Sequence, residues 1–228
     1  MAQPKEALAS GAPGRGLREI IADWAQDRRT FVMGWGKAMM WIFIISDIFV
    51  FGCFLAGYGA ARLAATEPWP DTSEVFALTI GGTEVPLLLI AIMTFILITS
   101  SGTMAMAVTY GHQRDRTKTA LFMGATTLLG LTFLGMQAFE WTHLIHEGFR
   151  PWSNPAGASQ FGSAFFMLTG FHGLHVSAGL IYLLIMTWRV ARGYYDRVGT
   201  YEPVEAAGLY WHFVDLVWVF IFAFLYLI

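Results

Sequence analysis

Charged residues and cysteine are both scarce in this chain, and each shortage excludes a class of protein. Asp, Glu, Lys and Arg make up 13% of the 228 residues, against roughly 25% in an ordinary soluble domain. The formal net charge of −2 gives no sign of a nucleic-acid partner. One cysteine, Cys53, leaves no disulfide and no cysteine-rich metal site within the chain. Hydrophobic residues make up 56%, so the composition indicates an integral membrane protein.

Proline is also missing from the interior of the long apolar stretches, since all eight prolines fall in tails, loops or a first helical turn. A helix needs about 20 apolar residues to cross the hydrocarbon of a bilayer, and five stretches are long enough. Without an internal proline, each can satisfy its own backbone hydrogen bonds. The sequence therefore predicts an all-α bundle of five transmembrane helices. They are expected at residues 38–61, 86–110, 119–144, 162–188 and 206–228.

Lysine and arginine are divided unevenly between the two sides of these spans. Twelve of the 14 lie in the N-terminal tail and in the loops after the second and fourth spans, whereas Arg62 and Arg150 lie on the other side. Basic residues concentrate on the cytoplasmic side of membrane proteins. We therefore expect the N-terminus in the cytoplasm and the C-terminus in the periplasm. The first outer loop is acidic, which agrees with this orientation: it carries Glu67, Asp71, Glu74 and Glu84.

The N-terminal tail, residues 1–36, precedes the predicted five-helix domain at residues 37–228. Its first thirty residues have no apolar signal core, so no cleaved signal peptide is expected. Within residues 16–29, apolar side chains recur at helical spacing with charges between them, which predicts an amphipathic helix. That helix is expected either to lie on the cytoplasmic membrane surface or to dock on a partner.

Polar residues inside the spans are costly and therefore informative. An ionisable side chain near the middle of a membrane helix costs roughly 2.5–3.5 kcal/mol on insertion scales. In the last span His212 and Asp215 are three residues apart, so they share one helix face, which must meet protein rather than lipid tails. The candidate site residues within the spans or at their mouths are Asp47, Gln137, Glu140, His143, His172, His175, Glu205, His212 and Asp215.

These residues allow two chemical interpretations. Glu140 and His143 have the Glu-x-x-His spacing of carboxylate di-iron bundles, and His172 and His175 could add nitrogen ligands. However, such a site needs a second Glu-x-x-His, which the chain lacks. Alternatively, the intramembrane carboxylates could relay protons or ions. A transporter would show two related halves and broken helices at the midplane, and neither is visible.

A third interpretation, structural pairing, is favoured over both. Here the polar groups bond to one another across helices and fix their register. A stripe of small residues in the fourth span would let another backbone approach closely: Gly170, Gly173 and Ser177. No catalytic residue and no metal ligand is then expected in this chain.

Four segments resemble haem–copper oxidase subunit III. Residues 165–176 (FFMLTGFHGLHV) resemble the penultimate helix of that family, and residues 205–218 (EAAGLYWHFVDLVW) resemble its last helix. Residues 137–141 (QAFEW) resemble its Gln-x-x-Glu-aromatic segment. Residues 41–47 (WIFIISD) stand where the family usually has Trp-x-x-x-x-Ser-Glu. The resemblance covers about residues 37–228, and the two later segments are the most specific.

The resemblance implies the five-helix form of the subunit. This form carries no haem and no copper and packs against subunit I, which holds both, with subunit II in the same complex. The subunit is expected to stabilise subunit I, support proton uptake and protect against inactivation during turnover, in a complex that reduces oxygen to water and pumps protons. Phospholipid is expected in an exposed groove, and no nucleic acid is expected. The expected location is the bacterial inner membrane rather than the mitochondrial one, and membership of a supercomplex stays open.

Site residues carry over by position. Asp47 takes the place of the family's carbodiimide-reactive carboxylate, although it is one methylene shorter than the usual Glu. Six residues match motif positions and are expected in the polar interior: Glu140, His172, His175, Glu205, His212 and Asp215. The main interpretation is a cytochrome c oxidase, and the alternatives are a quinol oxidase or the related protein associated with nitric oxide reductase. A stand-alone transporter or metalloenzyme is a more remote alternative.

Overall fold

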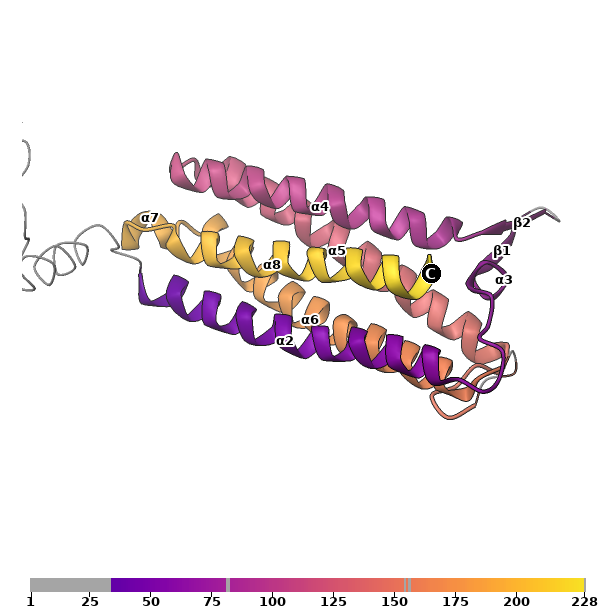
Figure 1. Ribbon diagram of the computed structural model, residues 1–228. Coiled ribbons are helices and arrows are strands. Elements are labelled where there is room, and N and C mark those ends of the chain that lie inside the picture. The colour runs from indigo at the N-terminus through magenta and orange to yellow at the C-terminus, as the bar shows by residue number, and fades with distance from the viewer. Residues whose placement is uncertain (1–33, 81–82, 154, 156, 228) are drawn as a thin grey trace, which may run out of the picture. The chain divides into compact units, whose positions relative to one another are not determined.

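The computed structural model describes residues 34–80, 83–153, 155 and 157–227. Five helices are long and apolar enough to cross a membrane, which confirms the predicted all-α membrane bundle. The predicted amphipathic helix at 16–29 lies outside the described residues. The five helices are α2 (Trp35–Ala64), α4 (Leu88–His112), α5 (Arg116–His146), α6 (Ser159–Ala191) and α8 (Glu202–Ile221), which continues as the π-helix η2 (Phe222–Tyr226) (Figure 1).

Most helices extend beyond their predicted ends, because they continue into polar sequence that hydropathy excludes, but the second helix begins later than predicted. The second helix begins at Leu88, not at Pro86, which ends a strand instead. The last begins at Glu202 and holds Pro203 in its first turn, where a missing N–H does no harm. Helix α5 begins three residues before its predicted start, next to a capping side chain: Asp115 accepts a hydrogen bond from the backbone N–H of Lys118 at 3.1 Å.

Short elements that the sequence did not predict lie at the two ends of the bundle. Between α2 and α4 the chain forms α3 (Thr72–Val75) and an antiparallel hairpin of β1 (Ala77–Ile80) and β2 (Thr83–Pro86). At the opposite end, α7 (Tyr194–Val198) links α6 to α8 (Figure 1). Strands of four residues are too short for hydropathy to reveal. We call the two ends the hairpin end and the α7 end.

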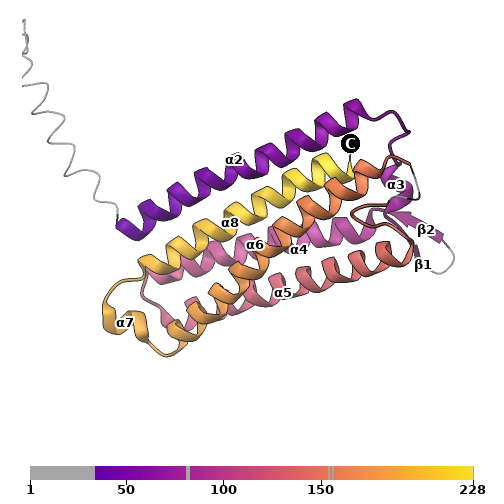
Figure 2. The same ribbon diagram turned by 90° about the horizontal axis from the view of Figure 1, so that it is seen from below.

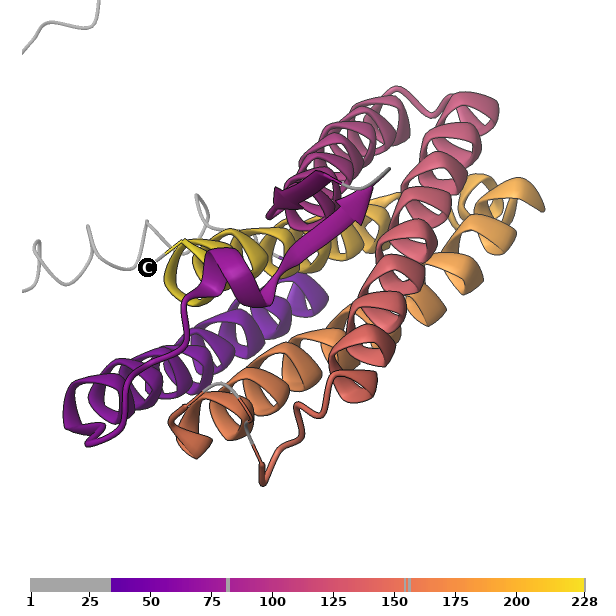
Figure 3. The same ribbon diagram turned by 90° about the vertical axis from the view of Figure 1, so that its right-hand side faces the viewer.

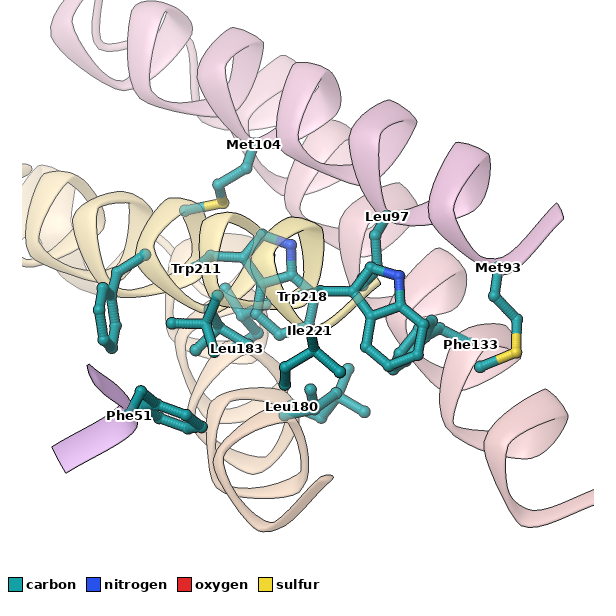
Figure 4. Close-up of a cluster of buried hydrophobic side chains, with 14 of the residues drawn as sticks. Phe51, Met93, Leu97, Met104, Phe133, Leu180, Leu183, Trp211, Trp218 and Ile221 are labelled. Atoms are coloured by element: carbon teal, nitrogen blue, oxygen red, sulfur yellow. The ribbon is translucent and has the colours of Figure 1, made fainter. Parts of the chain in front are cut away.

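Helix α8 lies in the middle of the bundle, with α2, α4 and α6 around it and α5 behind α4 and α6 (Figures 2 and 3). It runs from the α7 end to the hairpin end, antiparallel to α4 and α6 (Figure 2). The tryptophans of α8 form the centre of the core, since Trp211 and Trp218 have no exposed surface. In Figure 4, Leu97 reaches them from α4 and Leu180 from α6, and Phe133 of α5 lies beside Trp218.

Glycines allow this close packing around α8. A Cβ atom on Gly130 of α5 would lie 2.7 Å from side-chain atoms of both Leu180 and Trp211. A Cβ on Gly208 of α8 itself would lie 2.8 Å from Val108 of α4. Real Cβ atoms essentially never come this close to a non-bonded atom. Larger residues at either position would therefore push the helices apart, as expected for small residues at membrane helix interfaces.

Candidate functional site

Two tryptophans of α8 donate hydrogen bonds to α4. Trp211 Nε1 donates to Ser100 Oγ at 3.0 Å, and Trp218 Nε1 donates to Thr94 Oγ1 at 3.1 Å. The tryptophans are seven residues apart, so they lie on one face of α8, which is antiparallel to α4. Both indole N–H groups are therefore satisfied inside the apolar core, where an unmade hydrogen bond would be costly.

Of His212 and Asp215, the pair predicted to share a face, His212 contacts Ser101 of α4. The Ser101 hydroxyl lies 2.6 Å from His212 Nδ1. Neither oxygen of the Asp215 carboxyl accepts a hydrogen bond from the described residues. Asp215 is buried. The predicted polar face therefore meets protein, as its cost in lipid requires.

Asp47 of α2 faces His175 of α6, with 3.1 Å between Oδ2 and Nε2. The other ring nitrogen, Nδ1, lies 2.9 Å from the carbonyl oxygen of Phe171. Since a carbonyl oxygen only accepts, Nδ1 carries a proton in this arrangement. Tyr210 of α8 donates to the His175 carbonyl at 2.9 Å, so α2, α6 and α8 meet here.

Glu140 lies in a separate group near the hairpin end. It is buried, and Oε2 accepts hydrogen bonds from Gln137 Nε2 at 2.6 Å and from the Tyr226 hydroxyl at 3.2 Å. Gln137 is one helical turn before Glu140 on α5, whereas Tyr226 comes from η2. The group therefore fastens the C-terminal turn of the chain to α5.

His172 is fully inside the bundle and packs as an aromatic ring. It stacks on Trp218 with 5.3 Å between ring centroids and meets Phe133 edge-on at 6.1 Å. Neither ring nitrogen has a hydrogen-bond partner among the described residues. Its ring contacts are with Trp218, Phe133 and Phe51.

Glu205 joins three helices at the α7 end. One of its oxygens pairs with the Lys37 ammonium of α2, and the other lies 2.5 Å from His112 Nε2 of α4. Nearby, the Tyr201 hydroxyl donates to Asp196 at 2.5 Å. Burial, together with this carboxylate, raises the pKa of Tyr201 to about 12. The α7 end thus combines these charged and hydroxyl contacts with buried side chains such as Tyr195 and Val204.

His143 lies apart from the buried set. Its side chain is 46% exposed near the end of α5, and Nδ1 lies 3.5 Å from Glu147 one turn later. Glu140, three residues earlier, is buried. The Glu-x-x-His spacing therefore does not bring the two side chains to one site. Among the described residues, no three or more His, Cys, Asp or Glu side chains gather in a way that could hold a metal ion.

The stripe of small residues on α6 is used in part. Gly170 lies against Trp141 of α5, since a Cβ there would be 3.1 Å from the ring. A Cβ on Gly173 would meet no atom within 4 Å, and Ser177 donates to the Gly173 carbonyl of its own helix. Close approach by another backbone at Gly173 therefore stays a prediction. No described residue of this chain fills the space beside Gly173.

Sequence reasoning found the costly residues but missed most of their partners. Ser100, Ser101 and Thr94 were hidden in the apolar second span, and Tyr226 in the last. The sequence did contain a usable signal. The second and last spans each carry two adjacent polar residues, and in the structure Ser100 contacts Trp211 and Ser101 contacts His212.

The fold and the contacts define a multi-pass helical membrane protein whose intramembrane polar groups mostly join one helix to the next. Comparison with known proteins places it further. The model of the cytochrome c oxidase subunit III family matches residues 17–228. The chain is 34% identical over 202 residues to the probable quinol oxidase subunit 3 of Staphylococcus aureus (strain USA300), covering 89% of this chain and 93% of the relative. It is 35% identical over 188 residues to the cytochrome bo(3) ubiquinol oxidase subunit 3 of Pseudomonas aeruginosa, covering 82% of each.

This chain belongs to the cytochrome c oxidase subunit III family, the subunit III family of haem–copper oxidases. The predicted resemblance is confirmed. It is therefore subunit III of a terminal oxidase, a multi-subunit complex in which it accompanies catalytic subunits. The five apolar helices and the bacterial relatives agree with a multi-pass protein of a bacterial membrane.

Proposed function

We propose that this chain is the non-catalytic subunit III that braces subunit I of a proton-pumping oxidase, with subunit II in the same complex. In this proposal the haems and the copper belong to the partner subunits and the chain binds none. The observation that carries the proposal is the use of the intramembrane polar groups: Asp47, Glu140 and His212 contact other helices or the chain's own C-terminal turn. Groups used in this way supply mechanical support rather than chemistry.

Large uncovered apolar faces support a role beside a partner. Along α2, Ile42, Ile45 and Phe49 are 59%, 51% and 71% exposed, and their spacing places them on one face. Leu174 and Ile181 form a similar surface seven residues apart on α6. In a membrane, lipid tails and protein cover such faces equally well. We propose that subunit I covers one of them and phospholipid the other.

The distribution of charge supports the proposed orientation, with the N-terminus in the cytoplasm and the complex in the bacterial inner membrane. Seven described basic residues lie at the α7 end, including Lys37, Arg114 and Arg192, and two, Arg62 and Arg150, lie at the hairpin end. Basic loops mark the cytoplasmic side. We further propose that this end supports proton uptake by the complex, since it carries the exposed His112 beside Glu205.

For the electron donor we propose cytochrome c, following the description of the matching family. A quinol is the second candidate, because both relatives named above are called quinol oxidase subunits. Oxygen uptake by the purified complex would decide between them. A cytochrome c oxidase would be driven by reduced cytochrome c and not by a quinol. The reverse result would establish the second candidate, and reduction of nitric oxide without oxygen would overturn both.

The bracing role is tested by affinity purification of the tagged chain from bacterial membranes in a mild detergent. We expect a haem-bearing subunit to purify with it, together with oxygen reduction. Gentle removal of this chain should leave the haem content intact but shorten the time for which the remaining complex keeps turning over. A tagged chain that purifies without any haem protein, or a depleted complex with unchanged lifetime, would contradict the proposal.

A further inference from the structure

A small cavity lies beside Glu140 at the hairpin end. It has a volume of about 20 Å³ and lies between the first turn of α4, the last two turns of α5 and the end of α3. Its walls are mostly apolar, and Phe76, Ile90 and Leu144 are among them. A water molecule needs roughly 10–15 Å³ of such space. The cavity is therefore large enough for one water molecule and too small for a larger ligand.

Glu140 brings an unsatisfied oxygen to this cavity. Its Oε2 accepts hydrogen bonds from Gln137 and Tyr226. Its Oε1, by contrast, is shielded and has no hydrogen-bond partner among the described residues. A shielded carboxyl oxygen without a partner is costly inside an apolar bundle. A small polar ligand that reaches Oε1 from the cavity would remove this cost.

His143 is the second polar residue that borders the cavity. Its side chain is 46% exposed, and Nδ1 lies 3.5 Å from Glu147, which leaves Nε2 for another contact. His143 shares no buried metal site with Glu140, but it follows Glu140 by about one turn on the same face of α5. The cavity therefore has a carboxyl group on its buried side and an imidazole on its exposed side.

Water fits this pair of groups better than a metal cation does. A hard cation such as Ca²⁺ takes about six to eight oxygen ligands, whereas the described lining residues offer the carboxyl group of Glu140 and the imidazole of His143. A buried water needs about two to four polar partners, and an apolar cavity stays dry. Water both donates and accepts, so it can satisfy Oε1 in either protonation state of the carboxyl.

We propose that this cavity binds one water molecule, held between Glu140 Oε1 and His143 Nε2. The water completes a series of hydrogen bonds that starts at Tyr226 of η2, passes through Glu140 and ends at His143, which reaches the aqueous phase at the hairpin end. Beyond His143 lies Glu147. The site goes beyond the bracing role, because the carboxyl that fastens η2 to α5 also stays connected to the water outside the bundle.

The test is hydroxyl-radical footprinting of the whole oxidase complex in detergent, in which radicals formed from bound water oxidise the side chains beside it. Phe76 reports on the cavity, because it lines the cavity and is only 6% exposed. Phe133 is the matched reference, since it is 0% exposed and does not line the cavity. The complex is transferred to water enriched in the heavy oxygen isotope seconds before irradiation. The isotope found in hydroxylated Phe76 then shows whether the bound water exchanges with the bulk.

A matched pair of variants tests the part of His143. His143→Phe removes the imidazole nitrogens and keeps a flat ring at an exposed position. His146→Phe is the control, because His146 is exposed near the same end of α5 and does not line the cavity. Oxygen reduction and the retention of subunit III are measured on every sample, so failure to assemble is seen separately from loss of the water.

In the wild-type complex we expect Phe76 to be labelled well above Phe133 and to carry the heavy isotope. In His143→Phe the water loses one of its two polar partners, so labelling of Phe76 should fall at least about fivefold, the effect of one hydrogen bond. His146→Phe should leave the labelling unchanged.

Three results would overturn the proposal. Labelling of Phe76 no stronger than that of Phe133 would mean that the cavity holds no water. Labelling with the light isotope alone would mean that the water is sealed from the bulk. The same labelling of Phe76 in His143→Phe and His146→Phe would remove His143 from the site.

Discussion

Helices α8 and α2 are both apolar enough to span a membrane, yet they are held in opposite ways. In the most apolar stretch of α8 56% of the residues are buried, against 17% in α2. Around α8, backbones approach closely at glycines and two tryptophans fill the centre. Helix α2 is joined to the others by long side chains, such as Phe51, whose ring lies 5.2 Å from Phe171, and by the Asp47–His175 and Lys37–Glu205 contacts.

The comparison shows that hydropathy alone does not tell which helix is central. The polar residues indicate the central helix better than hydropathy does. Helix α8 carries hydrogen-bonding groups on several sides, whereas α2 carries one buried carboxylate, Asp47, and Lys37, which pairs with Glu205. A helix held by few polar contacts has most of its surface left for lipid or another subunit. The following predictions test this difference.

The largest effect is expected in α8. Trp211→Ala would empty the centre of the core and leave Ser100 without its donor, at a cost of about 3–5 kcal/mol. We expect the chain to be lost from the purified complex or to be released at much lower temperature. Trp152→Ala, at an exposed position in the loop before α6, is the control and should have no such effect. Equal stability of the two variants would contradict the central place of α8.

A pair of glycine substitutions sharpens the comparison of buried and free surfaces. Gly130→Ala places a methyl group 2.7 Å from Trp211 and Leu180, so we expect destabilisation of about 1–3 kcal/mol. Gly173→Ala meets no atom within 4 Å and should leave the chain as stable as before. Thermal release of subunit III from the complex measures both. Destabilisation by Gly173→Ala alone would show that a partner backbone covers that position.

A smaller effect is expected for the contact that joins α2 to α6. A double-mutant cycle of Asp47→Ala and His175→Ala should give a coupling energy of about 0.6 kcal/mol, the average for interhelical polar contacts in membranes, and no more than about 1.7 kcal/mol. Denaturant unfolding in detergent provides the measurement. A coupling near zero would mean that α2 is held in place by its aromatic contacts and by its partners.

The smallest effect is expected at the start of α5. The N–H of Lys118 and its ammonium group lower the pKa of the exposed Asp115 carboxyl. The charged carboxyl therefore stabilises the folded chain above its ordinary pKa of 3.8, and this contribution is lost as the pH falls through the lower folded value. Asp115→Ala should lower the melting temperature slightly at neutral pH and not in strong acid. Asp115→Asn keeps a good N-cap and should behave more like the wild type.

Much of this fold follows from the sequence. The five spans could be predicted because about 20 apolar residues without proline have few alternatives in a membrane. The hairpin could not, because four-residue strands leave no periodic pattern. The helix ends were missed where capping and charged contacts, such as those of Asp115 and Glu205, extend helices beyond the apolar region.

The sequence showed which buried ionisable residues would be costly in a membrane, but it did not show which residues they would contact. Asp47, Glu140 and Asp215 stand out because each is expensive in lipid. Their partners do not stand out, because a serine or threonine in a membrane helix usually bonds to its own backbone, as Thr94 also does. Which residues meet depends on helix rotation and register, and these are set by packing across the whole bundle.

The central claim is that the imidazoles and carboxyls within this subunit support helices and hold no cofactor. The most direct test is the iron, copper and haem content of the purified complex in which His172 is replaced by Leu, because this buried ring has no hydrogen-bond partner among the described residues. We predict the same content per complex as in the wild type, with subunit III still present. Loss of one equivalent of metal or haem while subunit III is retained would contradict the account.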